Sequence, residues 1–521
     1  MTPTVTEFLL ARADDERCGL RFEDRSWSWR EVVRTCAQYA SLLRSLRRPG
    51  PFHVGVLLGN VPEFTFLLGG AAFSGAVLVG LNPTRRGEAL ARDVRLTDCQ
   101  LIVTDIAHAD LLAGLDLGVP VLLVDTPPWS ALLAEHAGAE LAPVAASPDD
   151  LLVLVFTSGT GGDPKAVRCT HGKIAFPGRM LAERFGLTGE DVTYVAMPLF
   201  HSNALMAGWA VGAAAGATIA LRRRFSASGF LPDVRRFGVT YANYVGKPLA
   251  HVLATPPRPD DADNPLRLVY GNEANEQDVR RFAERFGCRV VDGFGSTEGG
   301  IAIARTPDTP PGALGRLPDG VAVLDPDTGK PCATARFSPD GQLLNPDEAI
   351  GELVNTTGSG WFAGYYNAPD ADAERMRDGM YWSGDLAYLD ADGFCHFAGR
   401  TADWLRVDGE NLAAAPIERI LLRHPEIREA AVYAVPDPAV GDQVMAALVT
   451  TADFRPETVA DFLAAQPDLG PKQWPRYLRL AADLPRTATH KILKRHLMTE
   501  ALDTADPVYH REGSSYARHP G

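Results

Sequence analysis

Lysine is scarce in this sequence. Lysine and arginine together number 51, and only seven of these residues are lysines, which leaves 51 − 7 = 44 arginines. A lysine that falls inside a motif is therefore less expected by chance than an arginine. Positive charge as a whole is also in deficit, since 65 aspartates and glutamates give a net charge of −14. Nucleic-acid binding depends on a positive surface, so we expect no nucleic-acid partner.

Paired cysteines are also missing. The seven cysteines are dispersed and odd in number, and none forms a C-x-x-C pair. This pattern predicts reduced thiols in a cytoplasmic protein and no zinc site. The stretch Met1–Glu7 has neither a basic nor an apolar region, so we expect no signal peptide.

Long apolar runs are nearly absent. Only residues 204–221 are long and apolar enough to be considered as a membrane span. This run is rich in glycine and alanine and is followed by three arginines, Arg222 to Arg224. We predict a buried helix and strand beside a ligand tunnel, and no stable membrane span.

The order of apolar segments predicts the fold class. At 521 residues the chain exceeds the size of a single core, so more than one domain is expected. A capping box at Ser28 and Glu31 opens a helix, and strands and helices then alternate in the segments 53–58, 62–74, 77–81, 101–104 and 121–124. This alternation predicts an α/β architecture with a largely parallel sheet, whose ligand lies beyond the carboxyl ends of the strands. Residues 506–521 are polar and are expected to fray.

A glycine-rich loop follows the apolar strand 151–155. Its sequence is Phe156-Thr157-Ser158-Gly159-Thr160-Gly161-Gly162-Asp163-Pro164-Lys165-Ala166. The glycines let backbone N–H groups turn toward an anion, the three hydroxyls add hydrogen bonds, and Lys165 adds a point charge. This chemistry suits a polyphosphate, although a plain surface turn is the alternative for such a cluster taken alone. The loop is not a Walker loop, because Pro164 stands just before the lysine.

The loop resembles the phosphate loop of the adenylate-forming superfamily, which contains acyl-CoA synthetases, luciferases and peptide-synthetase adenylation domains. Two residues depart from the usual pattern: Gly161 replaces a hydroxyl residue and Ala166 replaces the last glycine. The resemblance covers residues 27–495, with seven motifs in the family's order. It implies a large N-terminal domain of stacked α/β sheets (residues 1–400), a hinge at 401–403, and a small mobile α+β domain (404–521). The segments 81–86 and 243–246 look most like long-chain and very-long-chain fatty-acyl-CoA synthetases.

The resemblance also implies nucleotide-binding and catalytic residues in the larger domain. His201 takes the place of an aromatic residue beside the reacting carboxylate, although an ordinary packed or surface histidine is the alternative. Residues 244–246 resemble a wall of the acyl tunnel, although an ordinary core strand is the alternative there. Thr297 would bond the α-phosphate, and Glu298, with Ser158, would bind Mg²⁺ through oxygen. The residues matched to the adenine turns are Gly271, Asn272, Glu273, Asp292, Gly293, Phe294, Gly295 and Ser296.

Further matches lie toward the end of the chain. Asp385 matches the ribose-binding aspartate, Phe397 would pack near the base, and Arg400 would pair with ribose and phosphate. Gly409, Glu410 and Asn411 resemble the segment that flanks the pantetheine thiol of CoA. Lys491 matches the lysine that contacts the carboxylate and α-phosphate, although His490 replaces the usual glycine before it. We interpret the motif at residues 364–369 as scaffolding.

The implied reaction has two steps. A carboxylate attacks the α-phosphorus of ATP to give an acyl-AMP and pyrophosphate, and the CoA thiol then takes the acyl group and releases AMP. We predict a large hydrophobic acid, either a fatty acid or a polycyclic carboxylate, and a possible homodimer. Three alternatives remain open: an enzyme impaired in adenylation that uses supplied acyl-AMP, a stand-alone enzyme that loads a carrier protein, and a non-catalytic nucleotide-binding module.

Overall fold

The chain, seen in a computed structural model, divides into two compact units. The first consists of Met1–Gly299 with Trp361–Ala373, and the second of Gly300–Gly360 with Glu374–Gly521. The structure describes residues 2–157, 164–274, 276–339, 343–400, 404–407, 410–437, 441–466, 469, 473–486, 492–513 and 515–519. The predicted hinge at 401–403 lies outside this part of the chain, so the predicted domain boundary stays a prediction.

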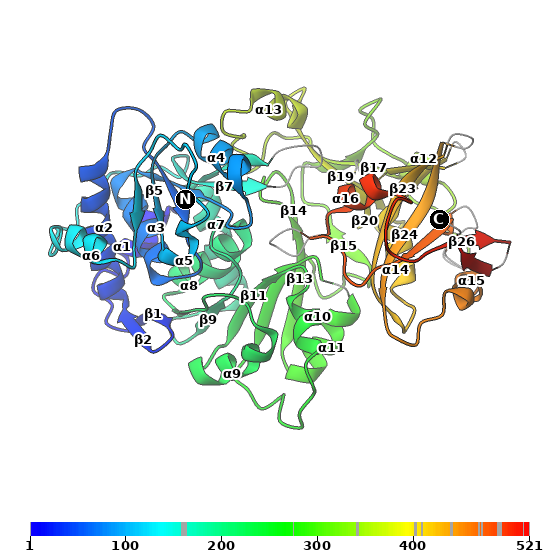
Figure 1. Ribbon diagram of the computed structural model, residues 1–521, viewed down its shortest axis with the longest axis horizontal. Coiled ribbons are helices and arrows are strands. Elements are labelled where there is room, and N and C mark those ends of the chain that lie inside the picture. Colours follow the sequence, from blue (N-terminus) through cyan, green and yellow to red (C-terminus); the bar gives the residue numbers. More distant parts are fainter. Residues whose placement is uncertain are drawn as a thin grey trace. The chain divides into compact units, whose positions relative to one another are not determined.

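The first unit contains a six-stranded sheet with the order β6-β5-β3-β4-β7-β8. Two of its strands, β5 and β7, are labelled in Figure 1. All neighbours are parallel except β7 and β8, which are antiparallel. Parallel strands need crossover helices, and the alternation predicted from the sequence is confirmed here. The strands are β3 (His53–Leu57), β4 (Val77–Gly80), β5 (Cys99–Thr104), β6 (Val121–Leu123), β7 (Leu151–Thr157) and β8 (Lys165–Thr170).

The strands of a second sheet that belong to this unit have the order β13-β12-β11-β9-β10-β1-β2. These strands are parallel except for the β1–β2 hairpin. The ends of β11, β12 and β13 therefore lie side by side, which is where a ligand is expected. The strands are β1 (Cys18–Phe22), β2 (Arg25–Ser28), β9 (Val192–Val195), β10 (Thr218–Leu221), β11 (Tyr241–Val245), β12 (Leu268–Asn272) and β13 (Arg289–Gly295).

The helices of the first unit connect these strands. The predicted capping box is confirmed, since the Ser28 hydroxyl accepts from the Glu31 N–H and the Glu31 carboxylate accepts from the Ser28 N–H. The helices are α1 (Val5–Leu10), α2 (Trp29–Leu46), α3 (Pro62–Ser74), α4 (Gly87–Leu96), α5 (Ile106–Ala109), α6 (Pro127–Ala134), α7 (His171–Phe185), η1 (Ala204–Trp209), α8 (Ala210–Ala215), α9 (Ala227–Phe237), α10 (Pro248–Leu253) and α11 (Glu276–Phe286).

The apolar run at residues 204–221 is a buried helix and strand, as predicted. It forms the π-helix η1, the helix α8 and the strand β10. Trp209 and Val211 have no exposed surface. In the described part of the chain, no helix combines the length and the apolar character that crossing a membrane requires.

The second unit contains two sheets. The first has the order β15-β20-β19-β17-β16, with β18 beside β19; its strands are β15 (Ala313–Arg316), β16 (Val321–Leu324), β17 (Gly351–Asn355), β18 (Met376–Arg377), β19 (Met380–Leu389) and β20 (Phe394–Arg400). The other has the order β22-β21-β24-β25-β26-β27, with β23 beside β24. Its strands are β21 (Trp404–Val407), β22 (Glu410–Ala413), β23 (Ile427–Asp437), β24 (Gly441–Thr450), β25 (Tyr477–Leu480), β26 (Val508–Glu512) and β27 (Ser515–Arg518).

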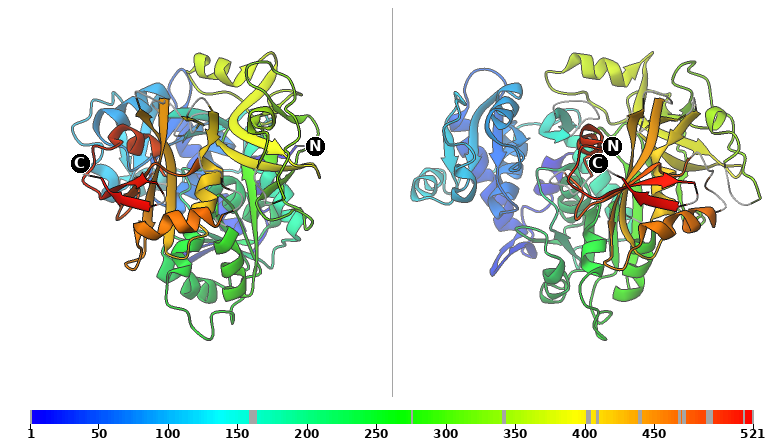
Figure 2. Two further views of the ribbon diagram at one scale, coloured as in Figure 1. Left: turned by 90° about the vertical axis from the view of Figure 1, so that its right-hand side faces the viewer. Right: turned by 45° about the vertical axis from the view of Figure 1, so that its right-hand side comes forward.

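The long antiparallel pair β23–β24 forms the centre of this last sheet, in orange in Figure 2. The helix α14 (Ala414–Leu421) packs against β23 around a core that includes Ile417 and Val432. The remaining helices of this unit are α12 (Pro346–Ala349), the 3₁₀ helix η3 (Pro456–Thr458), α15 (Val459–Ala464) and α16 (Lys494–Glu500), while α13 (Pro369–Arg375) contains the change from the first range to the second.

The expectation that residues 506–521 fray is wrong. They contain the hairpin β26–β27, and β26 continues the sheet beside β25. The reason is Tyr516, which is 2% exposed, packs into the core around Val432, and donates its hydroxyl to the Pro475 carbonyl at 2.5 Å. Burial of the Tyr516 ring offsets the conformational entropy that is lost when this polar segment becomes ordered.

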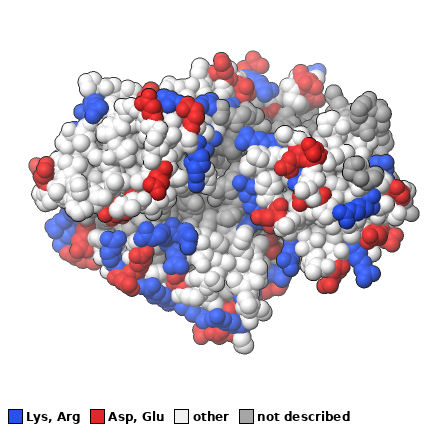
Figure 3. Space-filling view, viewed as in Figure 1, with Lys and Arg blue, Asp and Glu red and all other residues white. Residues whose placement is uncertain are grey.

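The described surface carries charges of both signs (Figure 3), and the predicted reduced thiols are present. Over the face drawn in Figure 3, acidic and basic side chains lie interspersed among the described residues. All seven cysteines are free thiols. Burial raises the pKa of the Cys99, Cys288 and Cys395 thiols to about 12, so they stay protonated and unreactive at neutral pH.

Candidate active site

The base of the glycine-rich loop is an antiparallel strand pair. Thr157 ends β7, Lys165 begins β8, and the two residues are direct Cα partners across the pair. The two strands therefore place the Thr157 hydroxyl and the Lys165 ammonium group at the same end of the β7–β8 pair. The predicted loop residues Ser158, Gly159, Thr160, Gly161 and Gly162 lie outside the described residues.

The Glu298 carboxylate lies at this end of the β7–β8 pair. Its Oε1 accepts hydrogen bonds from Thr157 Oγ1 at 3.3 Å and from the Tyr365 hydroxyl at 3.1 Å. Lys165 Nζ lies 5.4 Å from the centroid of the Tyr365 ring, within cation–π distance. The structure thus brings together three predicted site residues, and it adds Tyr365, which sequence reasoning missed. The sequence signal that could have identified Tyr365 was the motif at residues 364–369, which we interpreted only as scaffolding.

Tyr365 reaches Glu298 because its segment adds to the edge of β8. Arg168 N donates to the Gly364 carbonyl at 3.0 Å, and Tyr366 N donates to the Ala166 carbonyl at 2.8 Å. The Asn367 amide also holds the turn, donating to the Leu96 carbonyl at 2.9 Å. The segment is therefore fixed to the first sheet on both sides of Tyr365.

Thr297 meets the segment that carries His201. The hydroxyls of Thr297 and Ser202 are 2.7 Å apart and share a hydrogen bond. His201 precedes Ser202, and its ring lies 4.4 Å from that of Phe200. The π-helix η1 begins two residues after Ser202, and such helices often mark functional sites. Ser202 is a second residue that sequence reasoning missed.

The predicted adenine-contacting residues lie at the ends of β12 and β13. Gly271 and Asn272 are the last residues of β12, and the turn begins only at Glu273, whose φ is +67°. Residues 292–295 likewise belong to β13 and not to a turn, and Ser296 follows them. Asn272 Nδ2 donates to the Gly293 carbonyl at 2.7 Å, which ties the two strand ends together.

Gly271 is required by the close approach of Tyr244. A Cβ atom at Gly271 would lie 2.2 Å from the Tyr244 carbonyl oxygen and 2.6 Å from its ring. The Tyr244 ring thus lies against β12, and its hydroxyl donates to Asp292 Oδ2 on β13 at 2.6 Å. Asp292 Oδ2 also accepts from Ala274 N at 3.0 Å. These bonds fix the end of the sheet at the predicted site.

Tyr244 also lines a narrow apolar cavity of about 10 Å³. Most of the surrounding side chains are apolar, and they come from β9, β11, α9, α10 and α11: Tyr194, Phe230, Tyr244, Leu249, Val252 and Phe282. The cavity holds about one water-sized sphere. Two residues predicted to bind nucleotide also contact Tyr244: Gly271 lies against its ring, and Asp292 accepts from its hydroxyl.

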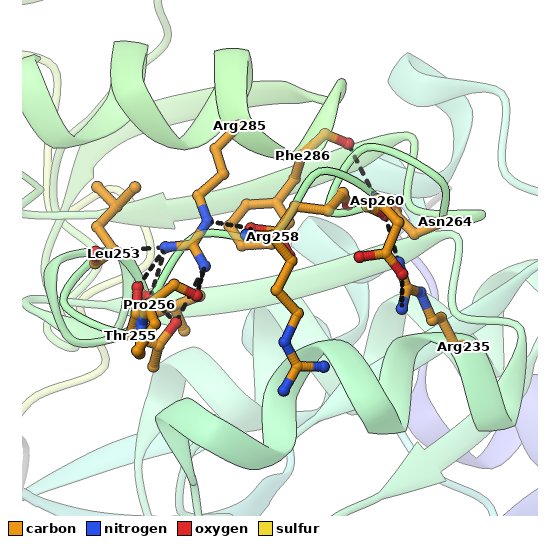
Figure 4. Close-up of polar contacts among 11 residues, drawn as sticks. Arg235, Leu253, Thr255, Pro256, Arg258, Asp260, Asn264, Arg285 and Phe286 are labelled. Atoms are coloured by element: carbon orange, nitrogen blue, oxygen red, sulfur yellow. Dashed lines mark hydrogen bonds and ion pairs between the residues drawn. The ribbon is translucent and has the colours of Figure 1, made fainter.

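Arg285 fixes the wall of this cavity. Its guanidinium, on α11, donates to the carbonyls of Leu253, the last residue of α10, and of Thr255 and Pro256 just after that helix, as Figure 4 shows. Asp261, which is 3% exposed, accepts from Arg285 Nε at 2.6 Å. A planar guanidinium with several carbonyl partners is well satisfied, so the chain after α10 is held in place without a helix of its own.

The second unit holds Asp385 in a buried position. Asp385 is 7% exposed on β19, and its Cα partner on β20 is Arg400. The neighbouring Gly384 has φ of +74° and donates its N–H to Glu352 Oε1 at 2.6 Å. Burial raises the pKa of Glu352, and the Gly384 bond partly opposes this shift. The predicted ribose-binding pair is thus adjacent in the sheet.

Several predicted residues remain untested. Phe397 lies on β20, and its carbonyl accepts from Arg419 at 2.9 Å. Glu410 and Asn411 lie in β22, paired with Val407 and Arg406. Gly409 and Lys491 lie outside the described residues, as does His490.

The donor set is compatible with Mg²⁺. This ion binds through one or two carboxylates, with the remaining ligands from water and substrate phosphates. Glu298 supplies one carboxylate, and its Oε1 is oriented by the hydroxyls of Thr157 and Tyr365. Among the residues that the structure describes, no three His, Cys, Asp or Glu side chains are grouped to hold a metal by themselves.

Comparisons with known proteins cover nearly the whole chain. The family pattern of the AMP-binding enzymes matches residues 10–366, and the pattern of the AMP-binding enzyme C-terminal domain matches residues 416–491. The chain is 55% identical over 510 residues to the medium/long-chain-fatty-acid–CoA ligase FadD17 of Mycobacterium marinum, covering 97% of this chain and 98% of the relative. It is 51% identical over 515 residues to the steroid-22-oyl-CoA synthetase of Rhodococcus jostii, covering 97% and 92%.

Solved structures share the fold. ATP-bound MatB from Rhodopseudomonas palustris matches with a TM-score of 0.83 at 24% identity, covering 96% of this chain and 99% of that one. The o-succinylbenzoate CoA synthetase MenE from Bacillus subtilis matches with a TM-score of 0.77 at 24% identity, covering 95% and 98%. The predicted fold class, a large α/β N-terminal domain and a small C-terminal domain, is confirmed.

Proposed function

This chain belongs to the family of AMP-binding enzymes, and on that basis we propose that it activates a medium- or long-chain hydrophobic carboxylic acid as an acyl adenylate and transfers the acyl group to CoA. The observation that carries the proposal is that Thr157 and Tyr365 both donate hydrogen bonds to the Glu298 carboxylate at the end of the β7–β8 pair. The predicted enzyme class, an ATP-dependent acid–thiol ligase, is confirmed by the relatives that match nearly the whole chain. ATP and CoA are the co-substrates of that class.

In the first step, the carboxylate oxygen attacks the α-phosphorus of ATP and pyrophosphate leaves. Such chemistry depends on positioning and charge neutralisation. Lys165 would neutralise phosphate charge, the Thr297 hydroxyl would bond the α-phosphate, and Asp385 with Arg400 would hold the ribose. Mg²⁺, held by Glu298 and Ser158, would neutralise phosphate charge. Lys491 would contact the carboxylate and the α-phosphate from the small domain.

In the second step, the CoA sulfur attacks the acyl carbon, and the bond to AMP breaks. The small domain would turn at residues 401–403, so that Lys491 leaves and Gly409, Glu410 and Asn411 flank the pantetheine arm. Hinge motions of this kind need only a few residues that change φ and ψ. The alternation would let one site perform both steps.

The acyl chain would lie between His201 and Tyr244. Most of the side chains beside Tyr244 are apolar, which supports a hydrophobic acid, although the cavity of about 10 Å³ among them is itself too small to hold an acyl chain. The two relatives named above are a medium/long-chain-fatty-acid–CoA ligase and a steroid-22-oyl-CoA synthetase. Fatty acids and polycyclic carboxylates therefore remain the two candidate classes, as in the sequence-based prediction.

Ala166 bears on the alternative of impaired adenylation. Its side chain has no exposed surface and belongs to the core with Leu154 and Phe156. The methyl group that departs from the family's glycine thus lies in a packed core, which supports the two-step reaction.

Pyrophosphate release tests the proposal. The purified chain is supplied with ATP, Mg²⁺ and a panel of fatty and polycyclic acids, with and without CoA. We expect acid-dependent release of pyrophosphate, with acyl-CoA formed only when CoA is present. Acyl-CoA from supplied acyl-AMP without any pyrophosphate release would overturn the two-step reaction, and transfer to a carrier protein in preference to CoA would overturn the acceptor.

The proposal extends to assembly and location. A homodimer in the cytoplasm is the state we propose, in keeping with the free thiols and with the frequency of dimers among soluble enzymes. Light scattering during size-exclusion chromatography measures the mass directly. A single species near the 56.1 kDa of one chain would contradict the dimer.

A further inference from the structure

Lys173 is a buried lysine beside Glu298. It is only 3% exposed. Lysine is also the scarcest charged residue of the chain. It lies in the first turn of α7, where the Thr170 hydroxyl accepts a hydrogen bond from the Lys173 N–H at 3.2 Å. A buried ammonium group is costly unless its hydrogen bonds are made, so its partners are informative.

The ammonium group bonds to two backbone carbonyls. Nζ donates to the Glu298 oxygen at 2.8 Å and to the Arg168 oxygen at 3.2 Å. Burial lowers the pKa of Lys173, while the nearby Cys169 and Glu298 oppose that shift. One cation therefore ties the residue after Thr297 to the strand β8, which begins at Lys165 and to which the Tyr365 segment is bonded.

The turn after Glu298 is packed against Lys173. Gly299 has φ of +73°, and a Cβ atom there would lie 3.2 Å from Lys173 Cε and 3.1 Å from Trp361 Cβ. Gly299 N also donates to the Ser296 carbonyl at 3.1 Å, and Trp361 N donates to the Gly299 carbonyl at 3.0 Å. The turn consequently has little room to shift while Lys173 is in place.

Thr297 and Glu298 are adjacent in sequence, and different residues hold their side chains and their backbone. The Glu298 carboxylate is held by Thr157 and Tyr365, the Thr297 hydroxyl by Ser202, and the Glu298 backbone by Lys173. The two hydroxyl contacts to the carboxylate orient a side chain that has its own rotatable bonds. The Lys173 contact acts instead on the backbone from which both Thr297 and Glu298 project.

We propose that Lys173 is a positioning residue for adenylation, which fixes the backbone of Glu298 so that the Thr297 hydroxyl and the Glu298 carboxylate face the ATP phosphates. This inference rests on the proposed function of the same site. It assigns no contact between Lys173 and the substrate. It predicts that loss of the ammonium group weakens the step that uses MgATP more than the step that starts from acyl-AMP.

The test compares Lys173→Met, which keeps the aliphatic chain, with Lys173→Arg, which keeps the charge. Lys330→Met, at an exposed lysine of the second unit, is the matched control. Three quantities are measured on the full chain: kcat/KM for MgATP in pyrophosphate release, the rate of acyl-CoA formation from supplied acyl-AMP and CoA, and hydrogen exchange of the backbone amides at 296–299.

We expect Lys173→Met to lower kcat/KM for MgATP at least 10-fold, to change the acyl-AMP reaction less than threefold, and to speed exchange at 296–299. Lys173→Arg should recover part of the loss, and Lys330→Met should match the unmodified chain. Equal losses in both reactions without recovery by arginine, or unchanged exchange and kinetics, would overturn the inference.

A folding defect leaves the inference testable. If Lys173→Met does not fold, Lys173→Gln, which keeps one donor in place of the ammonium group, is expected to show the same selective loss at smaller size. Kinetics equal to those of the unmodified chain in Lys173→Gln would overturn the inference. If the unmodified chain itself releases no pyrophosphate with any acid, the proposed function fails, which is a different outcome.

Discussion

The Tyr365 hydroxyl donates a hydrogen bond to Glu298 Oε1 at 3.1 Å, across 67 residues of sequence. Tyr365 is nearly buried, and its segment is bonded to β8, so the hydroxyl is held at a fixed place. A carboxylate that is oriented before substrate arrives costs less to organise during the reaction. Tyr365 therefore connects the motif at 364–369 to the chemistry proposed for Glu298.

Tyr365→Phe should slow adenylation while the fold is kept. A hydrogen bond to a charged group contributes about 1.5 kcal/mol, which is about 10-fold in rate. We expect kcat/KM for MgATP to fall by about this factor in pyrophosphate release. Tyr366→Phe is the matched control, because its hydroxyl bonds to Asp98 on a surface turn. Equal activity of the two variants would show that the Tyr365 bond has no part in adenylation.

Tyr244→Ala should change which acids are accepted. The Tyr244 ring lies between the end of β12 and the apolar cavity, so its removal enlarges that space. We expect the ratio of kcat/KM for a long-chain acid to that for a medium-chain acid to rise about 10-fold, roughly the value of two buried methylene groups. The measurement is acyl-CoA formation across a series of chain lengths.

Tyr244→Phe separates the ring from its hydroxyl. It keeps the ring in the cavity wall and removes only the bond to Asp292. Its chain-length preference should therefore equal that of the unmodified chain. A preference that does not move in Tyr244→Ala would mean that the acyl chain lies elsewhere.

Local signals predicted the secondary structure of the first unit well. The capping box at Ser28 fixed the start of α2, and the apolar segments at 53–58 and 151–155 correspond to the buried strands β3 and β7. Helix caps and apolar runs are properties of neighbouring residues, so the sequence carries them directly. The strand ends were less accurate, since Gly271 and Asp292 lie inside strands.

The contacts of the site could not be predicted in the same way. Thr157 and Glu298 are 141 residues apart, and Lys173 and Glu298 are 125 apart. Family motifs named Thr157 and Glu298 separately, but they gave no partner for either side chain. Lys173 and Ser202 stood beside recognised motifs, and the scarcity of lysine was the one signal that could have drawn attention to Lys173.

Tyr516→Ala should destabilise the second unit. The ring is buried in the core with Val432, so truncation leaves a cavity that costs about 3 to 5 kcal/mol. Urea unfolding, followed by circular dichroism, measures the change in the free energy of unfolding. Ser515→Ala, at the exposed start of β27, should change it by less than about 0.5 kcal/mol. Equal stability of both variants would restore the expectation that this end of the chain is frayed.

His171 should make the first unit less stable in mild acid. It is 3% exposed, and burial lowers its pKa from 6.5 to about 4, with Asp150 partly opposing the shift. Between pH 6.5 and about pH 4 the unfolded chain binds a proton that the folded chain does not, so the free energy of unfolding falls as the pH drops through this range.

The expected loss of stability through His171 between pH 7.5 and pH 5 is about 2 kcal/mol. His171→Gln does not titrate, so its free energy of unfolding should fall by about 2 kcal/mol less between these two pH values, with a smaller slope against pH. His251→Gln, at an exposed position, should keep the original slope. Chemical denaturation at a series of pH values measures these slopes, and the same slope in His171→Gln as in the unmodified chain would mean that His171 is protonated equally in the folded and unfolded states.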